Sequence, residues 1–283
     1  MSKLDDAIFV SGLKKSYKNK EVLKDVSFTV LSGTIYALLG SNGAGKTTIV
    51  KILSTLLKPD DGKVAVNGFD LIKQADKVRE SISLTGQFAA VDEVLTGREN
   101  LNLIGQLRYL PDMKKKTEEW LSLFSLEDAS DAKVSTYSGG MRRRLDIAMS
   151  LVGNPQVLFL DEPTTGLDPQ NRIAMWDLVK ELSERGTTIF LTTQYLEEAE
   201  YLADTVAILH KGEILVEGTP QYLKEIMPSR GTKLHFNSEE HALKAVKILS
   251  ENGIDSGDVE QNLPSLEDVF LALITETEEE IHG

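Results

Sequence analysis

The sequence contains no cysteine, so it has no disulfide framework, no thiolate metal site and no cysteine nucleophile. No apolar run approaches the roughly 18 residues that a membrane-spanning helix needs. Residues 1–6 also lack the apolar core of a signal peptide. From these absences we expect a chain that is soluble on its own, and its 283 residues are enough to bury a sizeable core.

Positive charge is outweighed by negative charge, with 31 basic and 44 acidic residues. The net charge of −13 argues against a broad nucleic-acid-binding surface. From residue 220 onward five basic residues face thirteen acidic ones, so we expect the closing run at residues 276–280 to be a solvated tail. The basic triplet at residues 142–144 is more typical of a solvated or carboxylate-paired helix face than of a nucleic-acid patch.

Glycine is concentrated in the run GSNGAGKTT, which follows an apolar strand-like segment, residues 35–39, and opens into a helix-like segment. Glycines let a backbone wrap an anion, and a helix N-terminus favours negative charge. Lys46 is expected to reach the β- and γ-phosphates of a nucleotide, and the Thr47 hydroxyl to bind Mg²⁺. The alternative is an ordinary glycine-rich turn. The residues predicted to surround the phosphates are Gly40, Ser41, Asn42, Gly43, Ala44, Gly45, Lys46, Thr47 and Thr48.

A second candidate lies where the apolar segment at residues 157–160 ends in two carboxylates. Asp161 is expected to hold Mg²⁺ through water, and Glu162 to polarise the water that attacks the γ-phosphate. A helix N-cap acid pair would give the same local sequence. The order of phosphate loop, apolar strand and Asp-Glu favours the catalytic interpretation.

A third candidate is the Ser138-Gly139-Gly140 segment, where two glycines open a further helix. A helix N-terminus of this kind is a second anion site, for which one nucleotide in one domain has no use. Two copies facing head to tail would each present this segment to the nucleotide of the other. A serine N-cap followed by a flexible Gly-Gly turn is the alternative.

Around these sites the sequence predicts two strands within residues 8–30 and a helical insert from Thr96 onward. Thr96 with Glu99 forms a capping box. Asp168-Pro169 predicts an N-cap followed by proline at the first helical position. We expect a domain boundary at Thr219-Pro220, and beyond it a strand, a helix at residues 238–250 and another helix capped by Ser265.

These motifs, in this order, resemble the ATP-binding subunits of ABC transporters. Residues 40–48 resemble their Walker A motif, residues 138–141 their signature motif and residues 157–162 their Walker B motif. The resemblance implies that Asp168 belongs to the D-loop and that Tyr17 stacks on adenine. It also implies that Gln87 is the Q-loop glutamine, which contacts Mg²⁺ and faces the membrane subunit; Tyr17 could instead be an ordinary surface or core tyrosine.

The resemblance extends to daunorubicin-resistance-type ATP-binding subunits. It implies an α/β fold: a P-loop NTPase (RecA-like) core with an antiparallel β subdomain, an α-helical insert at about residues 88–152 and a small C-terminal α+β appendage. The ATP-binding domain would span residues 1–219 and the acidic appendage residues 220–283. The segments that support this narrower resemblance are residues 84–92, 95–101, 137–146, 192–199 and 264–270.

Such a subunit is an ATPase that uses ATP and Mg²⁺, dimerises around ATP with a second copy of itself, and powers a separate permease with several membrane spans. The pair exports drugs, antibiotics or lipids. The resemblance therefore implies a cytoplasmic location, peripheral on the inner face of the membrane through the permease alone, with no nucleic-acid partner. One alternative is a soluble ABC-type ATPase acting on ribosomes or DNA. Another is a P-loop kinase or GTPase, although the sequence lacks the guanine-binding motif of a GTPase.

Two residues depart from the wider ABC pattern. Gln194 stands where the switch histidine usually sits, and Met141 replaces the usual signature glutamine. A glutamine amide can donate a hydrogen bond to the γ-phosphate, but it cannot carry charge near neutral pH. We therefore expect Gln194 to act at the phosphate, with hydrolysis slower than in a histidine-switch enzyme and ATP binding intact.

Overall fold

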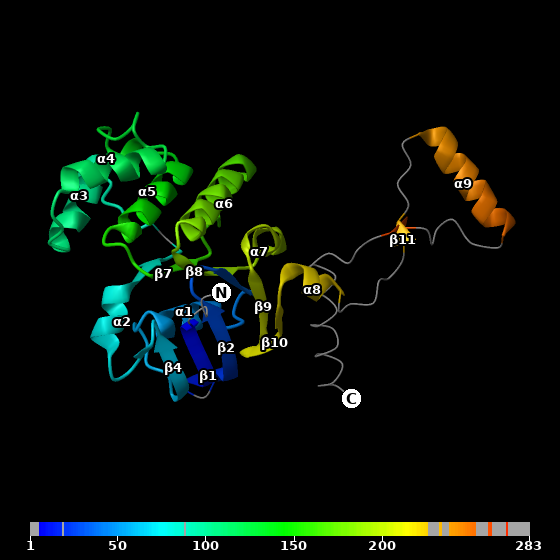
Figure 1. Cartoon of the computed structure of the whole chain (residues 1–283), viewed down its shortest axis with the longest axis horizontal. Coiled ribbons are helices and arrows are strands. Elements are labelled where there is room, and N and C mark those ends of the chain that lie inside the picture. The colour runs from blue at the N-terminus through cyan, green and yellow to red at the C-terminus, as the bar shows by residue number, and fades with distance from the viewer. Residues whose placement is uncertain are drawn as a thin grey trace. The chain divides into compact units, whose positions relative to one another are not determined.

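Figure 1 shows the computed structural model, which describes residues 6–18, 20–87, 89–225, 232–233, 238–252, 260–261 and 270. The chain divides into two compact units, Met1–Glu217 and Gly218–Gly283. In the described residues no helix is both long enough and apolar enough to cross a membrane.

An antiparallel sheet begins the first unit. Its strands follow the order β2-β1-β4-β5. Every second residue of β2 from Val26 to Val30 is buried, as expected for a strand with one face on a core. The strands are β1 (Asp6–Tyr17), β2 (Lys20–Leu31), β4 (Asp61–Val66) and β5 (Phe69–Asp70).

The second sheet has six strands in the order β10-β9-β3-β8-β7-β6. Its central strands pair in parallel. Every residue of β3, β7 and β8 is buried, which is the pattern of parallel strands covered on both faces. The strands are β3 (Ile35–Leu39), β6 (Ile82–Thr85), β7 (Val157–Asp161), β8 (Thr188–Thr193), β9 (Thr205–His210) and β10 (Glu213–Gly218).

Three stacked aromatic rings join the two sheets. Phe28 of β2 lies 5.3 Å from Tyr36 of β3, and Tyr36 lies 5.5 Å from Phe190 of β8, measured between ring centroids. All three side chains are buried. Aromatic pairs at this spacing contribute about 0.5–1.5 kcal/mol beyond the area that they bury. The stack therefore fixes the antiparallel sheet against the strands that carry the candidate site.

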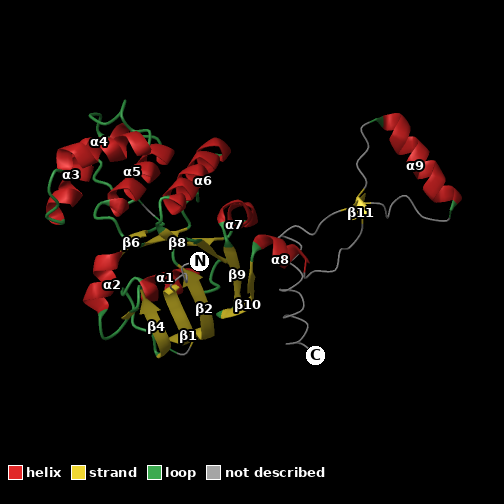
Figure 2. Cartoon of the chain, viewed as in Figure 1, coloured by secondary structure: helices red, strands yellow, loops and turns green. Residues whose placement is uncertain are grey.

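Helices cover the parallel sheet, and α3, α4 and α5 lie with α6 on the side of it away from the antiparallel sheet (Figures 1 and 2). The helices α3, α4 and α5 fall within residues 88–152, the range predicted for a helical insert. The helices are α1 (Lys46–Leu53), α2 (Ala75–Ser81), α3 (Gly97–Leu107), α4 (Met113–Leu123), the 3₁₀ turn η1 (Val134–Thr136), α5 (Gly139–Leu151), α6 (Pro169–Glu184) and α7 (Leu196–Leu202).

Local capping signals place the helix starts. Thr96 and Glu99 form the predicted capping box of α3, with Glu99 N donating to Thr96 Oγ1 over 3.1 Å and Thr96 N to Glu99 Oε2 over 2.8 Å. The Asp168 side chain caps α6, with Pro169 as the first helical residue. Both predictions are confirmed, because caps are local and depend little on distant contacts.

The second unit contains α8 (Pro220–Glu225), a short antiparallel pair of β11 (Thr232–Lys233) and β12 (Glu260–Gln261), and α9 (Glu239–Glu251). The predicted helix at residues 238–250 is confirmed, with the Ser238 hydroxyl accepting the His241 N–H over 3.3 Å. The predicted helix capped by Ser265 lies outside the described residues, as does all but Phe270 of the 264–270 segment.

Candidate functional site

The predicted phosphate loop runs from the end of β3 to the start of α1 and requires glycine at two points. Gly45 has φ of +117°, and a Cβ there would lie 2.8 Å from Leu23 Cδ2. A Cβ at Gly40 would lie 2.5 Å from the Leu209 carbonyl oxygen. Only glycine fits both the backbone conformation and the close approach, and the glycines thus let the loop wrap closely over the end of the sheet.

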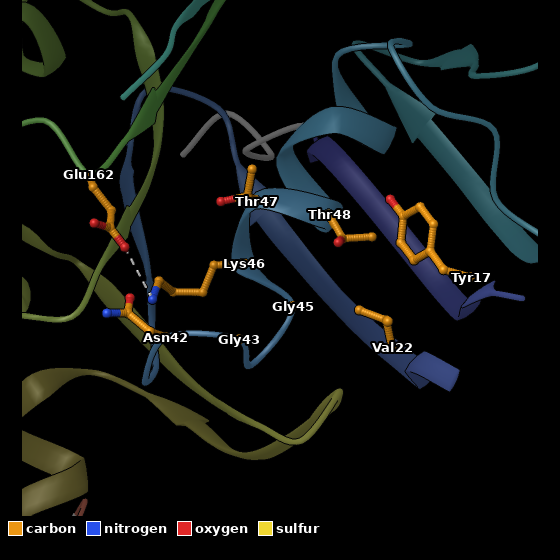
Figure 3. Close-up of a pocket in the computed structure, with 9 residues that line it drawn as sticks. All are labelled: Tyr17, Val22, Asn42, Gly43, Gly45, Lys46, Thr47, Thr48 and Glu162. Carbon is orange, nitrogen blue, oxygen red and sulfur yellow. Dashed lines mark ion pairs between the residues drawn. The ribbon is translucent and has the colours of Figure 1, made fainter. Parts of the chain in front are cut away.

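A cavity of about 220 Å³ lies over this loop. Figure 3 shows Tyr17 and Val22 on one side of it, with Lys46 and Glu162 on the other. Predicted residues from the first strand, the glycine loop and the end of β7 therefore meet here, and Val22 is a lining residue that the sequence analysis missed. The lining consists of Tyr17, Val22, Asn42, Gly43, Gly45, Lys46, Thr47, Thr48 and Glu162.

Lys46 is buried at the bottom of the glycine loop. Its Nζ donates to the carbonyl oxygens of Gly40 and Ser41 over 2.7 and 3.2 Å. The same atom lies 3.3 Å from Glu162 Oε1, the ion pair drawn in Figure 3. The side chains are 4% and 11% exposed, so this pair is shielded from solvent far more than a surface salt bridge.

Asp161, at the end of β7, lies beside two threonine hydroxyls. Thr192 donates to Asp161 Oδ1 over 2.5 Å, and Thr47 donates to the same oxygen over 3.4 Å. Carboxylate and hydroxyl oxygens are ligands that suit Mg²⁺. Two of the three residues predicted to contact the metal, Thr47 and Asp161, therefore have compatible chemistry and lie together at the mouth of the loop. Thr192 was missed because nothing distinguishes it locally from other strand threonines.

Glu162 has φ of +50°, in the left-handed region that residues other than glycine seldom adopt. Its N–H donates to the Thr192 carbonyl and hydroxyl oxygens, both over 3.1 Å, while Thr165 donates to Glu162 Oε2 over 3.2 Å. A strained backbone of this kind costs about 1–3 kcal/mol and is held by its surroundings. Here those surroundings fix a carboxylate at the cavity.

The Ser138-Gly139-Gly140 segment lies elsewhere, at the start of α5. Ser138 Oγ accepts the Met141 N–H over 3.3 Å, so the serine is an N-cap, which was the alternative left open by the sequence. Ser138 and Gly139 are exposed. Asp168 is also exposed, and hydrogen bonds from Asn171 lower the pKa of its carboxyl. None of these residues lines the cavity of its own chain.

Two predicted catalytic glutamines also lie outside the cavity lining. Gln87 is exposed just after β6. Gln194 is half-buried after β8, and the Thr193 carbonyl before it accepts the Gly40 N–H over 3.2 Å. The backbone therefore places Gln194 beside the start of the glycine loop, whereas Gln87 follows β6, the edge strand that pairs with β7.

Two buried charged residues near the site were missed. Burial raises the pKa of Glu198, which accepts hydrogen bonds from Thr164 Oγ1 over 2.7 Å and Trp176 Nε1 over 2.9 Å. Its place on the inner face of α7 with Ala199 and Leu202 was the signal that could have found it. Arg143, from the basic triplet, pairs with the carboxylate of Asp146 as the sequence allowed, but both side chains are buried, which the sequence analysis did not predict.

The sequence of this chain is similar to a known protein family and to individual members of it. Residues 23–165 match the family model described as ABC transporter. The chain is 42% identical to the daunorubicin resistance ATP-binding protein DrrA3 of Streptomyces coeruleorubidus, over 95% of this chain and 96% of that protein.

Two solved structures are similar in fold. One is an ATP-binding subunit of an ABC transporter, with a TM-score of 0.71 and 26% identity, covering 96% of this chain and all of that one. The other is a dimeric post-hydrolysis state of the ATP-binding cassette MJ0796 bound to ADP and Pi, with a TM-score of 0.67 and 26% identity, covering 75% of this chain and 98% of that one. The predicted α/β P-loop NTPase fold is confirmed.

Proposed function

The chain belongs to the ABC transporter family and is an ATPase of that family, and from this premise we propose that it is the ATP-hydrolysing subunit of an exporter. In this proposal two copies close around ATP and power a separate membrane permease, which exports drug, antibiotic or lipid-like substrates. One observation carries the proposal: Ser138, Gly139 and Asp168, which are predicted to bind ATP, are exposed and do not line the cavity of their own chain, which supports a site completed by a second copy.

The first surface binds the nucleotide. The glycine loop directs backbone N–H groups at the phosphates, and Lys46 supplies the cation for the β- and γ-phosphates. Tyr17, which is 46% exposed beside Val22, offers a ring face for adenine. Glu162 orients the attacking water as general base.

Thr47 and Asp161 are the residues that would hold Mg²⁺, and Gln87 would reach it from its own loop. The metal would neutralise charge on the phosphate oxygens. Gln194 would donate its amide to the γ-phosphate, beside the loop at which the backbone places it.

The second surface would complete the site of the partner copy. Ser138, Gly139 and Gly140 open α5, whose N–H groups and dipole favour an anion. Asp168 lies close to this segment. A Cβ at Gly140 would lie 2.5 Å from Asn171 Oδ1, and Asn171 Nδ2 donates a hydrogen bond to Asp168 Oδ2. Head-to-tail pairing of two copies would bring this cluster to the γ-phosphate.

The export proposal draws on the relatives. The 42% identical protein is described as a daunorubicin resistance ATP-binding protein, and one similar structure as a subunit of a transporter. A subunit of this kind would sit at the inner face of the membrane only through its permease.

The test begins with Glu162→Gln, which removes the general base but leaves the cradle. With ATP and Mg²⁺ this variant should accumulate as a dimer in size-exclusion chromatography with light scattering, and ADP should give a monomer. A monomer under both conditions would contradict the shared site. Capture from detergent-solubilised membranes should then recover a multi-span protein; recovery of ribosomes would instead support a soluble ATPase.

A further inference from the structure

Arg143 and Asp146 form a buried ion pair on α5, one turn inside the helix that Ser138 caps. Their side chains are each 7% exposed, and Arg143 Nη1 lies 3.3 Å from Asp146 Oδ2. Removing two charges from water is costly, and a buried pair of this kind is often replaceable by apolar residues without loss of stability. The pair also contacts chain segments outside α5.

The guanidinium of Arg143 reaches the backbone on both sides of Glu162. Its Nε donates to the Pro163 carbonyl oxygen over 2.9 Å, and its Nη2 lies 3.5 Å from that of Asp161. Its Nη1 donates to the carbonyl oxygen of Gly86, the residue before Gln87, over 2.5 Å. A planar group with five fixed donors can link several carbonyls at once, which a lysine cannot do.

Asp146 binds the other side of Gln87. Its Oδ1 accepts the N–H of Ala90 over 2.9 Å, while its Oδ2 faces Arg143. Burial raises the pKa of the Asp146 carboxyl, and the Ala90 N–H and the Arg143 charge act in the opposite direction. Both ends of the short segment that carries Gln87 are thus attached to the same ion pair.

The neighbouring arginines make different contacts. Arg142 donates to the Val134 and Ser135 carbonyl oxygens, and Arg144 to those of Phe124 and Ser125 at the end of α4. Within the described part of the chain, Arg143 is the member of this triplet that contacts the segments of both Gln87 and Glu162.

We infer that Arg143 and Asp146 are positioning residues, which clamp the Gln87 segment and the backbone around Glu162 to α5 so that the three move as one body. The α5 helix begins at the surface proposed to meet the partner's nucleotide. When two copies close on each other at that surface, a movement of α5 would therefore be passed to Glu162 and Gln87 through the Arg143 guanidinium. The role given to Gln87 in this inference rests on the proposed function.

Arg143→Lys tests the clamp, because it keeps the positive charge beside Asp146 and removes the fork that links three carbonyls. The full-length variant should show kcat for ATP lowered about 10- to 100-fold, the range expected when catalytic groups are misplaced by about 1 Å. Its KM for ATP should stay within about twofold, since the cradle is untouched, and its thermal unfolding midpoint should change little. Amide hydrogen exchange at Ala90 should accelerate at least fivefold.

Asp146→Leu provides the second variant, in case lysine partly restores the contacts. It removes the acceptor for Ala90 and should also accelerate exchange there. The matched control is Arg144→Lys, which removes a guanidinium from the same helix and releases only the end of α4. Its kcat and its Ala90 exchange should match those of the wild type within about twofold.

Gln87→Ala separates this inference from the proposed function. If it lowers kcat while Arg143→Lys and Asp146→Leu change neither kcat nor Ala90 exchange, the clamp is wrong and the role of Gln87 stands. If Gln87→Ala has no effect but Arg143→Lys lowers kcat with faster exchange, the clamp acts through Glu162 alone. A uniform loss of stability in Arg143→Lys, with KM and kcat changed together, would reduce the pair to a structural role and overturn the inference.

Discussion

Lys46 Nζ lies 3.3 Å from Glu162 Oε1, so the cation proposed for the phosphates is paired with the carboxylate proposed as the general base. The lysine is also held by the Gly40 and Ser41 carbonyl oxygens. An arriving γ-phosphate would compete with the carboxylate for the same ammonium group. The Lys46 charge should therefore strengthen ATP binding and the Glu162 charge should weaken it. Single substitutions of each residue can separate the two effects.

Glu162→Gln should bind ATP at least as tightly as the wild type, because the negative charge that competes for Lys46 is lost. Its kcat should fall about 100-fold or more, since general-base catalysis contributes about 10²–10⁴-fold. Equilibrium titration with a fluorescent ATP analogue and a phosphate-release assay measure the two quantities. Lys46→Met is the opposing variant and should weaken ATP binding at least tenfold. Equal ATP affinity in both variants would contradict competition at Lys46.

Gln194→Ala should lower kcat about tenfold with little change in ATP affinity, since one hydrogen bond to a charged group contributes about 1.5–3 kcal/mol. Gln194→Glu should be slower still, because a carboxylate beside the γ-phosphate adds repulsion. Steady-state kinetics at saturating Mg²⁺-ATP measure both. An unchanged rate in Gln194→Ala would show that this side chain does not act at the phosphate.

Gln194→His supplies the complementary variant. An imidazole with an ordinary pKa near 6.5 gains a positive charge as pH falls. The pH–rate profile of this variant should therefore contain a titration between about pH 6 and 7 that the wild type lacks. Identical profiles for the two proteins would place residue 194 too far from the phosphate to matter.

Glu198 ties α7 to α6 and to the loop after β7 through Trp176 and Thr164. Glu198→Ala leaves these two buried donors unpaired, so the free energy of unfolding should fall by about 2–5 kcal/mol. Urea denaturation of the first unit measures this change. Tyr201→Phe, which removes only the exposed bond from Tyr201 to Asp177, is the control and should change it by less than about 1 kcal/mol.

Glu198 should also make the free energy of unfolding depend on pH. Burial raises the pKa of Glu198 in the folded state above its unfolded value, with bonds from Thr193, Thr164 and Trp176 and the Arg172 charge opposing the shift. Between those two pKa values the folded state binds more protons, so stability falls as pH rises through this window and stays lower above the folded value. Glu198→Gln should remove this slope in urea denaturation series; an unaltered slope would assign it to other carboxyls.

Local signals allowed much of the fold to be predicted. Thr96 with Glu99, and Asp168 with Pro169, identify helix starts within four residues of sequence, and the structure confirms both. Arg143 is different, because its partners Pro163 and Gly86 lie 20 and 57 residues away. In the sequence it is the middle of a basic triplet. Contacts between distant segments depend on the packing of α5 against the sheet, which no local pattern specifies.

The last prediction concerns Gly140 and Asp168, which belong to the surface proposed to meet the partner's nucleotide. A Cβ at Gly140 would lie 2.5 Å from Asn171 Oδ1 and 2.8 Å from Asn171 Cγ. Asn171 Nδ2 donates to Asp168 Oδ2 over 2.6 Å, so the Asn171 side chain can move away from a Cβ at Gly140 only by breaking this bond to the residue that caps α6. Gly140→Ala should therefore displace Asp168 and abolish ATP-dependent dimerisation, measured by light scattering in the Glu162→Gln background. ATP binding to the monomer should be unchanged, since the cavity lies elsewhere in the chain.

Asn171→Ala tests the cause of that loss. It removes the clashing atoms, so the double variant Gly140→Ala/Asn171→Ala should recover part of the dimer that Gly140→Ala alone loses. A Cβ at Gly139 meets nothing within 4 Å, so Gly139→Ala in the same background measures the effect of a methyl group without the clash. If Gly139→Ala and Gly140→Ala weaken the dimer equally and Asn171→Ala restores nothing, the contact between the two segments has no part in pairing the copies. Recovery in the double variant alone would mean that Asp168 and the start of α5 act on the partner as one surface.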